Sequence, residues 1–96
     1  MDVVVAYDVN TETAAGRKRL RRVAKVCEGF GQRVQMSVFE CSLTRTEFER
    51  LRSQLVDVVH TELDSLRVYH LSGPREEVVE VIGRDHWIDM SGPMIM

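Results

Sequence analysis

The chain lacks a long hydrophobic run and a basic N-terminal segment. Its apolar stretch at residues 3–7 is far shorter than the roughly 18–20 residues that cross a bilayer. The same stretch follows an acid at position 2 and is too short for the hydrophobic region of a secretory signal peptide. We therefore expect a cytoplasmic protein with no membrane partner.

Cysteine is scarce, and no metal-binding or nucleotide-binding motif is present. Cys27 and Cys41 lie inside apolar patterns without C-x-x-C spacing, which favours reduced core thiols over a disulfide or a zinc site. The three histidines have no ligand spacing, and neither a Walker loop nor a Ser/His/Asp arrangement can be identified: His60, His70 and His86. These absences exclude the common zinc, nucleotide-hydrolysing and serine-hydrolase classes.

Aromatic residues make up only 6% of the chain, and the aromatic pattern of an RNA-recognition motif is missing. Hydrophobic residues nevertheless reach 44% and charged residues 29%, as in a globular protein. A chain of 96 residues forms one domain that buries only about 60% of its unfolded surface. We therefore expect one domain that completes its core by pairing.

One segment has no acidic residue at all. Residues 16–25, "GRKRLRRVAK", contain six basic residues: Arg17, Lys18, Arg19, Arg21, Arg22 and Lys25. The net charge of −2 hides this local excess, because the rest of the chain has seven basic residues against fifteen acidic ones. Without acids for i,i+4 pairing the charges repel one another, which favours a polyanionic partner over a merely solvated helix face.

Hydrophobic periodicity predicts the order strand, helix, strand, strand, helix, strand, followed by one more strand. The elements are a strand at 2–9, a helix at 14–29, a ribbon at 31–41, a helix from 44 to about 60 and strands at 65–71 and 78–82. This order is typical of the ferredoxin-like βαββαβ sandwich in the α+β class, with two helices on one face of the sheet.

The ribbon "GQRVQMSVFEC" changes phase halfway. Its apolar side chains lie first on one face and then on the other: Val34, Met36 and Val38, followed by Phe39 and Cys41. The ribbon must therefore be two strands, or one strand kinked at residues 35–37. Because the helices can cover only one side of the sheet, we expect a partner protomer to cover Phe39.

The C-terminal region is too apolar to be left in solvent. We predict a single domain over residues 1–96, with a core of about 1–72 and a C-terminal strand and tail of about 73–96 that pack on the partner of a homodimer. Residues 78–82 would join the sheet edge of the other protomer. Trp87, Ile88 and Met90 would then pack across the interface.

Three stretches, "VVVAYDV", "GQRVQMSVFE" and "DSLRVYHL", together resemble the CRISPR-associated protein 2 family, and the tail resembles its type I-C branch. The resemblance implies a homodimer that binds DNA or RNA, a metal-dependent endonuclease activity, and a role in spacer acquisition for antiviral defence. It also implies a protein partner, the CRISPR integrase CRISPR-associated protein 1. Met36 departs from the pattern, because the family commonly has an aromatic residue there.

The resemblance assigns roles to particular residues. Asp8 would bind Mg²⁺ and act in catalysis, with the two Asp8 carboxylates of a dimer sharing one ion. The residues alone favour the other interpretation, an aspartate that caps or turns the chain toward the helix. Ser37 and Phe39 match the family's "SVF" and would line a cleft with Tyr7. Phosphate binding falls to the basic helix and the ribbon: Arg17, Lys18, Arg19, Arg21, Arg22, Lys25 and Arg33.

Two functional hypotheses remain open from the sequence. The first is a Mg²⁺-dependent endonuclease that cuts RNA or DNA across the dimer. The second is a non-catalytic adaptor that holds DNA on its basic helices and bridges integrase subunits, with Asp8 only structural. A ferredoxin-like regulatory domain for a small ligand would explain the fold but not the basic helix.

Overall fold

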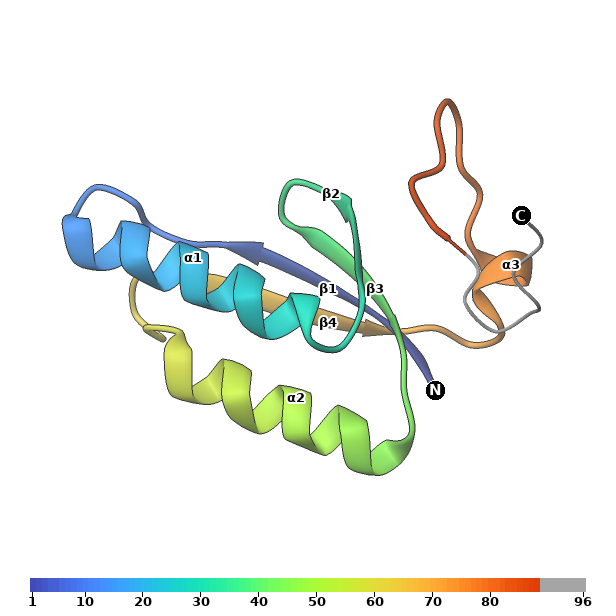
Figure 1. Cartoon of the computed structure of the whole chain (residues 1–96), viewed down its shortest axis with the longest axis horizontal. Helices are drawn as coiled ribbons and strands as arrows, with labels where there is room; N and C mark the ends of the chain where they lie inside the picture. Colours follow the sequence, from blue (N-terminus) through green and yellow to red (C-terminus); the bar gives the residue numbers. More distant parts are fainter. Residues whose placement is uncertain (89–96) are drawn as a thin grey trace.

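The structure is a computed structural model in which residues 1–88 are described, and it contains one antiparallel sheet covered on one face by two helices (Figure 1). The strand order is β2-β3-β1-β4, and the elements are β1 (Asp2–Asp8), α1 (Ala14–Glu28), β2 (Gln32–Gln35), β3 (Val38–Ser42), α2 (Arg45–Val58), β4 (Ser65–His70) and α3 (Arg75–Val78). The predicted ferredoxin-like sandwich is confirmed. No helix among residues 1–88 is long and apolar enough to cross a bilayer.

Strand β1 lies at the centre of the sheet because both of its faces are apolar. Val3, Val5 and Tyr7 point into the core beneath the helices, while Val4 and Ala6 are half-buried on the opposite face. It pairs antiparallel with β3 and with β4. The strand is thereby held between two neighbours, and its last residue, Asp8, pairs with β4.

The two long helices begin where side chains cap their free N–H groups. The hydroxyl of Thr13 accepts from the backbone N–H of Gly16 at the start of α1, and Thr44 forms a capping box with Glu47 at the start of α2. Each helix buries an apolar stripe against the sheet: Val23 and Cys27 from α1, and Leu51, Leu55 and Val58 from α2. Both predicted helices are confirmed within two residues at each end.

The cysteines are free and buried in this core, as predicted. Burial raises the pKa of the Cys27 thiol to about 12 and that of Cys41 to about 11. Both groups are therefore protonated at neutral pH.

The ribbon is a hairpin of two strands, one of the two arrangements predicted, with a turn at Met36 and Ser37 and a register shift between Arg33 and Gln35. The expectation for Phe39 is wrong. Its ring is fully buried in the core under the chain's own helices, 6.2 Å from the ring of Tyr7. The face that the helices leave open is the opposite one, which carries Val4 and Val38.

The C-terminal segment also differs from the prediction. Residues 75–78 form the short helix α3, and residues 78–82 contain no strand in the described chain. The segment after α3 borders the open face of its own sheet, where the side-chain amide of Gln32 bonds both backbone groups of Ile88 at 2.6 and 2.9 Å. Strand addition to a partner stays a prediction, and Met90 lies outside the described residues.

A buried ion pair attaches this segment to the sheet. The Arg75 guanidinium pairs with the Glu40 carboxylate of β3, and both residues are less than a tenth exposed. A second N–H of Arg75 donates to Asp85 at 2.8 Å, and the guanidinium lies 4.8 Å from the centre of the Trp87 ring. Trp87 thus packs within its own chain.

Candidate metal site and nucleic-acid interface

Asp8 lies at the exposed end of β1, where it pairs with Ser65 of β4. On the β3 side, the backbone N–H of Tyr7 donates to the Ser37 carbonyl at 3.1 Å. A shallow groove of about 290 Å³ opens at this end of the sheet, and its lining is rich in oxygen: Asp8, Asn10, Glu62, Leu63, Asp64 and Ser65. The end of the central strand therefore presents a carboxylate to solvent in a fixed backbone.

The donor chemistry of this groove fits Mg²⁺. The ion prefers oxygen ligands, takes one or two carboxylates and keeps several of its waters. Asp8 and Glu62 are both exposed and line the same groove. Within residues 1–88, however, there is no group of three or more His, Cys, Asp or Glu side chains that could hold a metal ion. One chain therefore offers a partial ligand set at most.

Asp64 lines the same groove but has no free acceptor site. Its two carboxylate oxygens accept four N–H groups: the Nε and Nη2 of Arg19 at 2.9 and 3.1 Å, and the backbone N–H groups of His60 at 2.9 Å and Asn10 at 3.1 Å. We call this arrangement the Asp64 clamp. The Arg19 guanidinium holds the pKa of Asp64 down at about 2, so the carboxylate is ionised.

Arg19 is therefore separated from the other predicted phosphate ligands. Its side chain is 15% exposed, and it crosses from α1 to the loop before β4 to reach a fully buried Asp64 side chain. Its bidentate bond to a carboxylate has the geometry that an arginine would use for phosphate. In this structure the Nε and Nη2 groups of Arg19 already donate to Asp64.

The remaining basic side chains of α1 face solvent. We call Lys18, Arg21, Arg22 and Lys25 the basic face of α1; all four are exposed, and within residues 1–88 none forms a salt bridge. Arg17 is exposed beside them and donates to the Thr11 carbonyl at 3.2 Å. These five cations form the part of the predicted interface that is open to a polyanion.

The three residues predicted to line a cleft are differently placed in the single chain. Tyr7 and Phe39 lie in the core, and burial raises the pKa of Tyr7, so this phenol is unsuited to proton transfer at neutral pH. Arg33 covers the Phe39 ring at 5.1 Å and pairs with Glu28 at 3.6 Å. Ser37 is half-buried in the hairpin turn, close to the end of β1.

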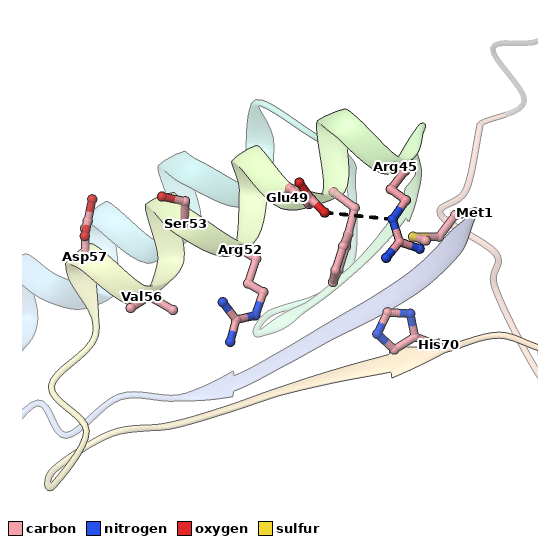
Figure 2. A pocket seen from close by; sticks show the side chains of 9 residues that line it. Met1, Arg45, Glu49, Arg52, Ser53, Val56, Asp57 and His70 are labelled. Atoms are coloured by element: carbon pink, nitrogen blue, oxygen red, sulfur yellow. Dashed lines mark ion pairs between the residues drawn. The ribbon is translucent and has the colours of Figure 1, made fainter.

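A wider groove of about 660 Å³ lies between α2 and the edge strand β4 (Figure 2). Its charges are mixed: Arg45 and Arg52 are set against Glu49 and Asp57, and Arg45 pairs with Glu49 at 3.8 Å. The His70 imidazole meets the Phe48 ring edge-on at 5.1 Å. Balanced charge makes this groove a poorer match for a polyanion than the basic face of α1.

Gly16 packs the start of α1 against the loop that follows Asp8. A Cβ added at Gly16 would lie 1.9 Å from the backbone oxygen of Asn10, so the loop would have to move. We expect Gly16→Ala to lower the free energy of unfolding by about 1–3 kcal/mol, the usual effect of overpacking. Urea unfolding measures the change. Gly73→Ala is the control, because a Cβ there meets its nearest atom at an ordinary 3.5 Å; equal losses in both variants would contradict the packing argument.

The sequence prediction missed the Asp64 clamp and the Arg75–Glu40 pair. The clamp joins residues 45 and 54 positions apart, and the ion pair joins residues 35 apart. A single acid in a polar loop has no periodic signal. The one available hint was the unusual excess of arginine on one helix, which does not identify a partner.

Comparison with known proteins extends over the elements just described. The family model for CRISPR associated protein Cas2 matches residues 1–77. The chain is 46% identical to CRISPR-associated endoribonuclease Cas2 1 of Moorella thermoacetica over 100% of both chains, and 45% identical to CRISPR-associated endonuclease Cas2 of Halalkalibacterium halodurans over 99% of both. The crystal structure of Streptococcus pyogenes Cas2 at pH 6.5 matches with a TM-score of 0.76 and 53% identity, covering 86% of this chain and 100% of that one.

Proposed function

Because this chain belongs to the family of CRISPR-associated protein Cas2, we propose that it acts in spacer acquisition as a homodimeric, nucleic-acid-binding endonuclease that requires Mg²⁺. The observation that carries the proposal is the exposed Asp8 carboxylate at the end of the buried strand β1. The pairing of Asp8 with Ser65 fixes the backbone from which this carboxylate projects.

Asp8 would hold the ion, and the dimer would complete the site. Bound Mg²⁺ polarises a phosphodiester and lowers the pKa of a coordinated water. Within residues 1–88, this groove offers the exposed carboxylates of Asp8 and Glu62, and a second copy that brings its own Asp8 would supply a further one.

The open face of the sheet supports the proposed homodimer. Val4 and Val38 are only partly covered there, and in the adjoining C-terminal segment Ile82 is 91% exposed. Apolar side chains in this position are usually covered by a partner. A symmetric pair would bury both copies of the face at once. Docking of the integrase, CRISPR-associated protein 1, is proposed from the family alone.

The adaptor hypothesis remains the second candidate, and one observation favours it. The basic face of α1 is fully formed in the single chain, whereas the ligand set around Asp8 is not. The test is to incubate the purified protein with labelled single-stranded and duplex RNA and DNA, with Mg²⁺ and with EDTA. Cleavage in Mg²⁺ alone supports the endonuclease; tight binding in both conditions without cleavage supports the adaptor.

The basic face of α1 predicts binding that depends strongly on salt. We expect Arg21→Glu combined with Arg22→Glu to weaken duplex binding whatever the base sequence and to flatten its salt dependence. Each phosphate that the variant no longer neutralises reduces the slope of log K against log salt by about 0.9. Titrations in EDTA at several salt concentrations measure this slope.

The control is Arg50→Glu combined with Arg52→Glu, which makes the same change of net charge on exposed residues of α2. We expect a smaller loss of affinity and a slope close to that of the wild type. Equal slopes for the two double variants would assign binding to net charge and contradict a defined interface on α1.

A further inference from the structure

The Asp64 clamp lies directly against the backbone that carries Asp8. Asp64 immediately precedes Ser65, the residue of β4 that pairs with Asp8. The same carboxylate accepts the N–H of Asn10, two residues after Asp8, at 3.1 Å. The chain that follows Asp8 and the strand beside it are therefore joined at one buried carboxylate.

We infer that Asp64, held by Arg19, is a positioning residue that fixes the Asp8 carboxylate for binding a divalent cation. This inference rests on the proposed function, because it concerns the same cation. Neither side chain needs to touch the ion or the nucleic acid. Their role is to hold the two loops and the strand end that surround Asp8 in one arrangement.

The Asp64 clamp also determines which carboxylates of the groove can bind a cation. A carboxylate has about four acceptor positions, and those of Asp64 are occupied by four N–H groups. Its side chain has no exposed surface in the single chain. Asp64 therefore does not compete with Asp8 for the cation, although both line one groove.

Arg19 supplies the charge that makes this arrangement stable. A buried, ionised carboxylate is strongly unfavourable unless a cation pairs with it. Without Arg19, Asp64 would turn toward solvent or take up a proton, and the loops at Asn10 and His60 would lose their shared acceptor. An arginine predicted to contact phosphate thus acts through Asp64 on the geometry of Asp8.

The test compares Asp64→Asn, Arg19→Gln and the double variant with the wild type. Mg²⁺ is titrated into each protein and followed by the NMR signal of the Asp8 amide, and exchange of the Asn10 amide is measured without metal. We expect each single variant to bind Mg²⁺ about 10–100-fold more weakly, as is usual when the partner that orients a ligand is lost. The double variant should be no weaker than the worse single one, and Asn10 should exchange faster in all three.

Two further variants separate positioning from general loss of stability. Glu40→Gln breaks the other buried ion pair, on the strand beside β1 and opposite Val4 rather than Asp8, and should leave Mg²⁺ affinity unchanged. Arg19→Lys keeps the charge but loses the fork, so it should retain part of the affinity. It also keeps the test valid if Asp64→Asn does not fold.

Three results would overturn the inference. The first is wild-type Mg²⁺ affinity in folded Arg19→Lys and Arg19→Gln proteins. The second is weaker duplex binding by Arg19→Gln in EDTA with Mg²⁺ affinity unchanged, which would make Arg19 a phosphate ligand. The third is a wild-type protein that binds no Mg²⁺ at Asp8; this result removes the proposed endonuclease as well, whereas the first two leave it in place.

Discussion

Replacing Asp8 by asparagine is expected to reduce Mg²⁺-dependent cleavage to the level seen in EDTA. The change is nearly isosteric but removes the charge that a hard cation requires. A bound metal ion contributes several kcal/mol to catalysis, so the loss should be roughly a thousandfold or more. Because Asp8 is exposed and its strand is held by β3 and β4, the fold should be retained.

The measurement is the initial rate of cleavage at saturating Mg²⁺, with circular dichroism and sedimentation as checks on fold and assembly. Asp57→Asn is the matched control, since it removes an exposed acid of α2 in the groove of Figure 2. Cleavage by Asp8→Asn at the rate of the control would assign Asp8 a structural role and contradict its proposed role as the metal ligand.

The largest effect on stability is expected from Arg75→Met. This variant leaves the Glu40 carboxylate, 7% exposed, without its cation. Removing one partner of a buried ion pair typically lowers the free energy of unfolding by about 3–5 kcal/mol. The contacts to Asp85 and Trp87 disappear with it, so the segment after α3 should detach from the sheet.

Urea unfolding measures the loss, and amide exchange across residues 79–88 reports the detachment. Arg84→Met is the control, because it removes an exposed arginine of the same segment. Combining Arg75→Met with Glu40→Leu should recover much of the stability, since replacing both partners by apolar groups removes the unpaired charge. If Arg75→Met is as stable as Arg84→Met, the ion pair does not hold the segment.

Hydrophobic periodicity was sufficient to predict most of the helices and strands and their order, because alternation and helical spacing are local properties of the chain. The helix predicted from 44 to about 60, for example, is observed as α2 over Arg45–Val58. Phe39 was assigned to the wrong face for a physical reason. Alternation reveals that two sets of side chains point in opposite directions, but only the pairing of β3 with β1 decides which set meets the helices.

The candidate site was predictable where a residue is exposed and part of a local motif. Asp8 and the basic face of α1 were found in this way. Arg19 was grouped with its neighbours because the sequence cannot distinguish an arginine in solvent from one that reaches a carboxylate 45 residues away. For the C-terminal segment, the sequence revealed the apolar run at 78–82 but not the Arg75–Glu40 pair that ties the segment before it to the sheet.

The rates at which the two buried thiols are alkylated report how often the core of this protein opens. Alkylating reagents attack the thiolate, and burial keeps both groups protonated while the core is closed. Modification therefore requires the core to open, and its rate follows the population of open molecules. Because Cys27 lies on α1 and Cys41 on β3, the two rates distinguish loosening of the basic helix from separation of the sheet. Nucleic acid bound to α1 would slow alkylation of Cys27 more than alkylation of Cys41. The two rates would therefore report binding without a label on the nucleic acid.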